Sequence, residues 1–299
     1  MAMQTLTTRP WVIAFPLVLL AACARLSAPP IAPSGSAEAY PATDMVRIPA
    51  GRFIMGSTER DRQYGYRLDE ERGSTAARKY QWFANETRRQ ITLPAYDIDR
   101  NLVTNADYQR FVLATGHRPP YVSETTWADY GLVHPYRTAQ RFNWTGTRYP
   151  PGRGKHPVVL VSAADAADYC RWRGQREHRP LRLPSEAEWE KAARGTTGQR
   201  FPWGNDFDPE KLNSADAGPF DTTAVDRYPD GASPYGVLNM AGMVFEWTAT
   251  ACPDKADQFI VKGGSWDDFP GVTRSAARHC RPRQLKHVLI GFRCAADAH

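Results

Sequence analysis

The sequence predicts an irregular α+β fold with little regular secondary structure. Helical periodicity is clear in only three short segments, and brief apolar runs that predict strands are separated by stretches rich in Gly, Pro, Asn and Asp. The 299-residue chain also carries nine tryptophans and thirteen tyrosines. We therefore expect aromatic side chains to pack the loops in place of regular layers.

The N-terminal segment has the features of a bacterial lipoprotein signal. The apolar run from Trp11 to Ala22 is too short to cross a membrane as a helix and is typical of a secretory signal peptide. Leu20–Cys23 resembles a lipobox, whose cysteine becomes the lipidated first residue, and Ala24 resembles the next residue of lipoproteins passed on to the outer membrane. We expect Cys23 to anchor the protein there through lipid, facing the periplasm or the cell surface. The alternative is an ordinary signal peptide that ends near a chance cysteine.

Domain organisation follows from composition. Residues 1–22 form the expected signal peptide, and residues 23–43 form a lipidated, Ala-, Pro- and Ser-rich tether that cannot bury enough apolar surface to fold. Residues 44–299 are long enough for one large core and predict a single domain. The net charge of +6 is spread along the chain, which argues against a nucleic-acid partner.

Each expected element of the domain depends on a local pattern. Ser162 to Gly174 predicts a helix because a serine stands at its start and apolar residues share one face. Ser185 to Arg194 begins with a capping box to Glu188 and is ended by Gly195. Thr104 to Thr115 is the third amphipathic segment. Strands are expected at Met45 to Ile48, Phe53 to Met55, Ile91 to Ile98 and Val158 to Val161.

Four cysteines follow Cys23. An even number favours disulfides in an oxidising envelope compartment, and spacing alone leaves three pairings open. No C-x-x-C occurs, so a zinc ribbon or a thioredoxin-type motif is not supported. The four are Cys170, Cys252, Cys280 and Cys294.

Four segments, in order along the chain, resemble one known family. They are MVRIPAGRFIMGS from Met45, RLPSEAEWEKAARG from Arg182 with a following FPWGN, SPYGVLNMAGMVFEWT from Ser233, and the stretch from VKGGSW at Val261 to IGFRCA. Together they look like the domain of formylglycine-generating enzymes and sulfatase-modifying factors, over essentially all of Met45 to Ala295. The resemblance implies an irregular α+β fold related to C-type lectins.

The resemblance also implies a pairing for the cysteines. In that family the cysteine of the helix before the R-L-P motif is bonded to the cysteine of the terminal G-F-R-C, and these positions correspond to Cys170 and Cys294. Cys252 and Cys280 remain for a second disulfide. The alternative for Cys280 is a buried or reactive thiol beside His279.

Structural calcium, bound by oxygen ligands, is a further implication of the resemblance. One ion is expected at a glutamate with three backbone carbonyls, although Met243 stands where the family usually has asparagine. The alternative is that this glutamate only accepts backbone hydrogen bonds in a tight loop. The ligands of the first ion are Ala241, Gly242, Val244 and Glu246, and those of a second ion are Asn213, Ser214 and Asp216.

Copper is not expected. Formylglycine-generating enzymes bind Cu(I) through two cysteines after a G-G-S motif, because a soft ion prefers thiolates. Here Gly263–Trp266 is followed by Asp267 and Asp268, and neither copper-binding cysteine is present. Cys280 does not align with either of the two copper-binding positions. Since two carboxylates cannot hold Cu(I) as two thiolates do, we do not expect copper-dependent oxidation of a cysteine to formylglycine.

Three functions remain open for this stretch. One is a periplasmic oxidoreductase acting on a peptide or metabolite, since the resemblance extends to sulfoxide synthases and to a pyoverdine-maturation protein. Asp267, Asp268 and His279 would then supply a site for a harder metal or an acid/base pair. The candidate catalytic residues are Trp247, Ser265, Asp267, Asp268, Arg274 and His279.

The second function, which we favour, is a binding module whose aromatic and arginine-lined cleft holds a peptide, a glycan or another envelope protein. Arginines suit an anionic group through forked hydrogen bonds. The candidate ligand-binding residues are Trp266, Arg278 and Arg281, with Arg274 nearby. The third function is structural, with Asp267 and Asp268 paired to these arginines to fix the loop.

Other charged residues are interpreted as structural. The stretch from Arg60 to Lys79 predicts a solvated insertion loop, with a partner-selecting rim as the alternative. We expect the side chains of Glu186, Glu188 and Glu190 to cap the helix or to face solvent. We expect His287 to be a packing residue.

Overall fold

The computed structural model describes residues 44–253 and 255–298. Contacts divide the chain after Ala39, and every described residue lies in the second unit, Tyr40–His299. The predicted signal peptide, the lipidation site at Cys23 and the predicted tether lie outside the described residues and stay predictions. Within the described part of the chain, no helix is long and apolar enough to span a membrane.

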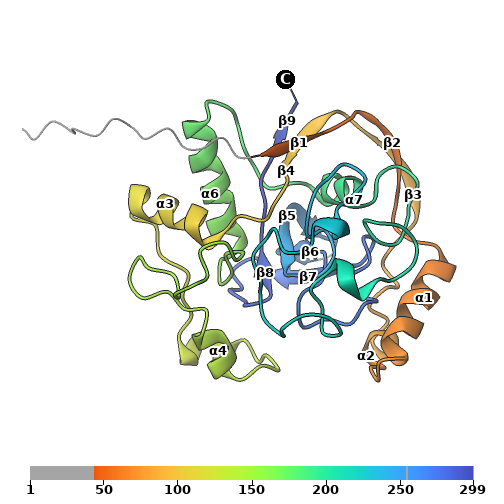
Figure 1. Cartoon of the computed structure of the whole chain (residues 1–299), viewed down its shortest axis with the longest axis horizontal. Coiled ribbons are helices and arrows are strands. Elements are labelled where there is room, and N and C mark those ends of the chain that lie inside the picture. Colours follow the sequence, from red (N-terminus) through yellow and green to blue (C-terminus); the bar gives the residue numbers. More distant parts are fainter. Residues whose placement is uncertain (1–43, 254, 299) are drawn as a thin grey trace, which may run out of the picture. The chain divides into compact units, whose positions relative to one another are not determined.

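The strands of the described residues form three small sheets (Figure 1). In the first, β4 (Tyr96–Asp99) pairs antiparallel with β1 (Met45–Ile48) and β9 (Ala295–Asp297), which joins the two ends of the domain. In the second, β2 (Gly51–Met55) pairs with β3 (Arg89–Leu93). The third has the order β7 (Arg278–Pro282), β6 (Lys255–Lys262), β5 (Phe245–Cys252) and β8 (Ile290–Gly291).

Short helices surround the third sheet. Figure 1 shows α3, α4 and α6 on one side of it and α1 and α2 on the other. The helices are α1 (Glu59–Glu70), α2 (Ala76–Lys79), α3 (Asn105–Thr115), α4 (Glu124–Asp129), α5 (Tyr136–Gln140), α6 (Ala163–Arg176) and α7 (Glu186–Arg194), with 3-10 turns η1 (Pro209–Lys211) and η2 (Pro229–Gly231). Long irregular segments connect these elements, which confirms the predicted α+β class with little regular structure.

All three predicted helices are present because their signals are local. The side chain of Ser162 caps α6 and that of Ser185 caps α7, each in a complete capping box. Thr104 caps α3 in the same way. Gly195, with φ of +69°, ends α7 as expected, whereas α6 continues past Gly174 to Arg176.

The predicted strands are confirmed in part. Met45 to Ile48 is β1, and Phe53 to Met55 lies within β2. Ile91 to Ile98 is two strands, β3 and β4, because Pro94 interrupts the pairing. The prediction for Val158 to Val161 is wrong, since these residues are buried but form no strand. An apolar run of four residues indicates burial more reliably than it indicates strand pairing.

Aromatic side chains fill the space between the elements, as predicted. Tyr108 of α3 stacks on Tyr169 of α6 with ring centroids 5.7 Å apart. The same ring makes edge contacts with Phe111 and Phe292. The main core cluster therefore runs from these helices to β5 and β8, where Phe245 and Ile290 are buried.

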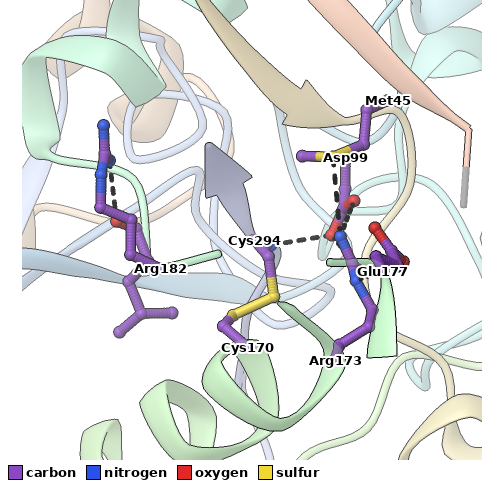
Figure 2. Close-up of a disulfide and its surroundings, with 8 residues drawn as sticks. Met45, Asp99, Cys170, Arg173, Glu177, Arg182 and Cys294 are labelled. Carbon is purple, nitrogen blue, oxygen red and sulfur yellow. Dashed lines mark hydrogen bonds and ion pairs between the residues drawn. A yellow bond between two sulfur atoms is a disulfide. The ribbon is translucent and has the colours of Figure 1, made fainter. Parts of the chain in front are cut away.

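Both predicted disulfides are present. Cys170 of α6 is bonded to Cys294, across 124 residues of sequence, and Cys252 is bonded to Cys280, across 28 residues. Figure 2 shows that the first disulfide lies beside the ion pair of Arg173 with Asp99. Closing such long loops restricts the unfolded chain more than the folded one. The alternative of a free thiol at Cys280 is wrong.

The charged stretch from Arg60 to Lys79 is not a loop. It forms most of α1 and all of α2, and Thr58 caps α1 in a further capping box. The face of α1 turned inward buries Tyr66, Leu68 and Asp69. Its remaining residues are so polar that the inward face did not stand out in the sequence.

Candidate ligand-binding site

The loop between β6 and β7, residues 263–277, begins with two glycines that the local packing requires. The backbone φ is +100° at Gly263 and +72° at Gly264, a region that favours glycine. A Cβ on Gly264 would lie 2.9 Å from Cγ2 of Thr273, and one on Gly263 would lie 3.1 Å from a ring carbon of Trp189. The chain therefore turns sharply after β6, and the loop that follows carries Asp267 and Asp268 to the wall of a cavity.

This cavity has a volume of about 700 Å³, within the range of small-ligand sites. It is lined by the end of α1, the segments after α2 and α4, the start of β5, the loop at 267–272 and the segment from 281 to 290. Its apolar wall consists of Trp82, Tyr130, Leu132, Val133, Phe245, Phe269, Val272, Pro282, Leu285, Leu289 and Ile290. Its polar side chains are Asp69, Ser74, Asp129, His134, Asp267, Asp268, Arg281, Gln284 and His287.

Asp69 and Asp268 line the cavity and have no ion-pair partner among the described residues, and the same holds for the exposed Asp129. Asp69 is 1% exposed and accepts a hydrogen bond of 2.6 Å from the backbone N–H of Gly271. Burial raises the pKa of Asp69 to about 7, and the charge of Asp268 adds to the rise. Asp268 accepts a hydrogen bond from the hydroxyl of Ser265, and burial raises the pKa of Asp268 to about 6. Both groups therefore titrate close to neutral pH.

The other carboxylate of the loop, Asp267, has a histidine partner. Asp267 lies 2.8 Å from Nε2 of His134, and this hydrogen bond raises the pKa of His134. Arg281 also faces the cavity, where burial lowers the pKa of its guanidinium. His287 is neutral because burial lowers its pKa to about 3, and its Nδ1 accepts a hydrogen bond from the N–H of Leu289.

Several predicted site residues belong to the scaffold and not to the cavity. Trp247 is fully buried, and its Nε1 donates to the carbonyl of Val161 at 3.0 Å. Arg274 donates to both oxygens of Glu86, at 3.0 and 2.8 Å. These two residues therefore do not line the cavity, and their polar groups are hydrogen-bonded within the core.

His279 and Trp266 also lie outside the residues that line the cavity. The ring of His279 makes edge contacts with Trp82 and Phe245, and burial lowers its pKa to about 3. Trp266 is fully buried and stacks on Phe142. His279 is therefore neutral at physiological pH and does not form the predicted set with the two loop acids.

The predicted arginine cluster for an anionic ligand is not formed. Nε of Arg278 lies 3.2 Å from Oε1 of Glu186. Arg278 lines a separate, polar cavity of about 440 Å³. Arg274 is neutralised by Glu86, which leaves Arg281 as the one predicted arginine that faces the large cavity. The predicted pairing of Asp267 and Asp268 with these arginines is not seen either, since Asp267 contacts His134.

The glutamates of α7 are buried, not solvent-facing. Glu190 accepts hydrogen bonds from Lys262 and Arg194, both at 2.9 Å. Glu188 forms the predicted capping box and pairs with Arg182. Arg182 and Arg194 are near neighbours in the sequence, whereas Lys262 comes from β6, 72 positions from Glu190, and the sequence around α7 does not reveal it.

In the first predicted calcium site, which stays a prediction, the carboxylate of Glu246 is already paired with an arginine. Both oxygens of Glu246 accept hydrogen bonds from Arg293, at 2.6 and 2.8 Å, and both side chains are fully buried. A guanidinium therefore stands where the cation was expected beside the carbonyls of Ala241, Gly242 and Val244. The alternative, a glutamate that only accepts backbone hydrogen bonds, is wrong as well.

The second predicted set fits an oxygen-preferring cation better. Oδ1 of Asn213 and Oγ of Ser214 are buried and have no hydrogen-bond partner among the described residues. Asp216 is paired with Arg72. Calcium held by these oxygens stays a prediction. No group of three or more His, Cys, Asp or Glu residues suited to a metal occurs in the described ranges, including the cavity wall.

Sequence reasoning missed three ionisable residues of the cavity, Asp69, Asp129 and His134. Asp69 was part of a predicted loop, Asp129 is the last residue of α4, and His134 follows α4, a helix that the sequence did not predict. The hydrogen bond from Gly271 to Asp69 joins residues 202 positions apart. The sequence did contain a signal for α1, because the capping box at Thr58 is followed by an amphipathic pattern. Leu68 and Asp69 stand at the end of that pattern.

Comparisons with known proteins agree with this fold. The sequence profile of the sulfatase-modifying factor enzyme 1-like domain matches residues 32–298. The formylglycine-generating enzyme of Mus musculus is 30% identical over 306 residues, covering 85% of this chain and 75% of that protein. A protein named inactive C-alpha-formylglycine-generating enzyme 2, also of Mus musculus, is 30% identical over 297 residues, covering 85% and 86%.

A solved structure agrees as well. PvdO from Pseudomonas aeruginosa superposes with a TM-score of 0.65 at 22% identity, covering 85% of this chain and 94% of PvdO. At that identity the likeness supports the fold and not the activity. From the profile match and the coverage of these relatives, the chain belongs to the sulfatase-modifying factor enzyme 1-like domain family.

Proposed function

We propose that the protein is an envelope lipoprotein whose domain binds a peptide, a glycan or a protein partner in the large cavity, without copper-dependent formylglycine formation. The observation that carries the proposal is the apolar cavity of about 700 Å³ with Asp267 and Asp268 in its wall. Such a cavity, with a few polar groups, is the usual form of a ligand site.

The cysteine chemistry of the domain supports binding over copper-dependent oxidation. Cys170, Cys252, Cys280 and Cys294 are all bound in disulfides, so the described residues offer no thiolate for Cu(I). Relatives named as active and as inactive enzymes are equally similar to this chain, so similarity does not assign an activity.

Anchoring supports a partner in the envelope. Cys23 follows Leu20-Ala21-Ala22, and about twenty residues rich in Ala, Pro and Ser separate it from the domain. A lipid anchor at Cys23, followed by a segment of this composition, would place the domain where it meets partners in the periplasm.

Site-specific photo-crosslinking in cells tests the proposal. A benzophenone amino acid would replace Leu132, which lines the cavity, and Leu113, which is 63% exposed on α3, as the matched control. We expect a defined adduct from position 132, absent from position 113, whose mass spectrum identifies a peptide, glycan or protein. Equal adducts at both positions would contradict the proposal. Conversion of a peptide cysteine to formylglycine by the copper-treated full chain would contradict it as well.

A further inference from the structure

The second cavity, of about 440 Å³, shares no lining residue with the large one. It is lined by the paired strands β2 and β3, by one face of α7 and by β7, the edge strand of the third sheet. The disulfide of Cys252 with Cys280 ties the end of β5 to β7 at this wall, where Cys280 and Pro253 both line the cavity. The volume is within the range of small-ligand sites. The cavity is therefore a candidate second site on a cross-linked part of the fold.

Two buried glutamates in its wall are fully matched by cations. Glu86 accepts two hydrogen bonds from Arg274, at 3.0 and 2.8 Å. Glu190 of α7 lies 2.9 Å from Arg194 and also 2.9 Å from Lys262. Because one carboxylate there meets two cations, these glutamates do not offset the arginines that line the cavity itself.

The two arginines of the wall have donors that the protein does not use. Nε of Arg278 lies 3.2 Å from Oε1 of Glu186, yet both atoms are buried and neither has a hydrogen-bond partner among the described residues. Arg89 forms no ion pair in the described part of the chain, and its Nη2 donates to Sδ of Met55 at 3.4 Å, a weak acceptor. Since buried donors in proteins are normally satisfied, these guanidiniums lack an oxygen acceptor.

The charges around this cavity are unbalanced toward positive. Five cations line it or contact its glutamates, against three carboxylates, so two positive charges have no counter-charge among the described residues. The large cavity has the opposite excess, with Asp69 and Asp268 unmatched. The cations here are Arg89, Arg194, Lys262, Arg274 and Arg278, and the carboxylates are Glu86, Glu186 and Glu190.

We propose that this second cavity binds a small dianion, a dicarboxylate or a phosphate, whose oxygens accept hydrogen bonds from the guanidiniums of Arg89 and Arg278. The parallel N–H donors of a guanidinium match the oxygens of both groups. A ligand with two negative charges balances the two unmatched cations. This inference goes beyond the proposed function, because it concerns a different cavity and a different class of ligand.

Calorimetric titration of the full chain in phosphatidylcholine nanodiscs tests this inference. The probes are succinate, inorganic phosphate and succinamide, which has the carbon skeleton of succinate and no charge. At pH 8 and about 0.15 M sodium chloride, which screens exposed charges, we expect a dianion to bind with one-to-one stoichiometry. Succinamide should bind at least about 10-fold more weakly than that dianion, because hydrogen bonds to charged groups are the stronger ones.

Variants show whether the two arginines hold the dianion. Arg89→Gln and Arg278→Gln should each weaken its binding at least about 10-fold, because each removes charge-assisted hydrogen bonds. Arg88→Gln is the matched control, since it removes the same charge from an exposed residue that does not line the cavity, and it should keep the affinity. Arg89 is exposed, so Arg89→Gln tests the site even if Arg278→Gln does not fold. Near-UV circular dichroism checks the folding of each variant.

The dianion that binds identifies the chemistry of the site. Succinate alone would support a dicarboxylate, and phosphate alone would support a phosphate group. The inference is overturned if neither dianion binds, or if succinamide binds as tightly as succinate. It is also overturned if Arg88→Gln weakens binding as much as Arg89→Gln, since that result indicates general surface charge. None of these results changes the crosslinking at position 132, which tests the proposed function separately.

Discussion

Buried charges in the core and in the large cavity are arranged in opposite ways. In the core, Arg173 meets Asp99, Arg274 meets Glu86 and Arg293 meets Glu246, each with two hydrogen bonds of 2.6–3.0 Å. In the cavity, Asp69 and Asp268 have only hydrogen-bond donors from the backbone or from a hydroxyl.

The difference separates scaffold from site. A matched pair satisfies both charges and ties together segments that are distant in sequence, as Arg293 and Glu246 do for β5 and the C-terminal segment. An unmatched acid in an apolar wall lowers the stability of the free protein and is available to a ligand. Arginine content alone therefore does not identify a binding site in this chain, since the predicted Arg274 serves the scaffold.

Breaking a matched pair should have the largest effect on stability. Glu246→Gln leaves Arg293 buried without a counter-charge, and we expect the free energy of unfolding to fall by about 3–5 kcal/mol. Urea denaturation with the disulfides intact measures the change. Glu59→Gln, at an exposed surface pair, is the control and should cause no detectable change. A similar stability for both variants would contradict the assignment of the core pairs to the scaffold.

Removing an unmatched acid should have a smaller effect of the opposite sign. Asp69→Asn keeps an oxygen for the N–H of Gly271 and removes a charge that the fold holds poorly. At pH 8 we expect the variant to be more stable than the native chain, by about 4 kcal/mol at most, because the pKa of Asp69 is raised from 3.8 to about 7 and one pKa unit corresponds to about 1.4 kcal/mol.

The gain from Asp69→Asn should depend on pH in a defined direction. The pKa of Asp69 is about 7 in the folded chain, above its ordinary value of 3.8, so the folded state binds more protons between these values. The native chain therefore loses stability from this group as the pH rises through that window. The two curves of unfolding free energy should meet near pH 4 and separate toward pH 8. Parallel curves would show that Asp69 is not perturbed.

The sequence predicted what depends on neighbours in the chain. The capping boxes at Ser162 and Ser185 join residues three positions apart, and both helices form as expected. The disulfides followed from the family resemblance. The cavity could not be predicted in this way, because Asp69, His134 and Asp268 come from three distant segments and their burial depends on tertiary packing. Arg274 and Trp247 were assigned to the cleft by position alone, and their partners Glu86 and Val161 were not foreseen.

Carbon-13 NMR of aspartate-labelled full chain in nanodiscs tests the central claim most directly. The account predicts that two carboxyls, assigned with Asp69→Asn and Asp268→Asn, titrate with apparent pKa values of about 7 and about 6. Apparent pKa values near the ordinary 3.8 for both carboxyls would contradict the claim that unmatched carboxylates mark the site.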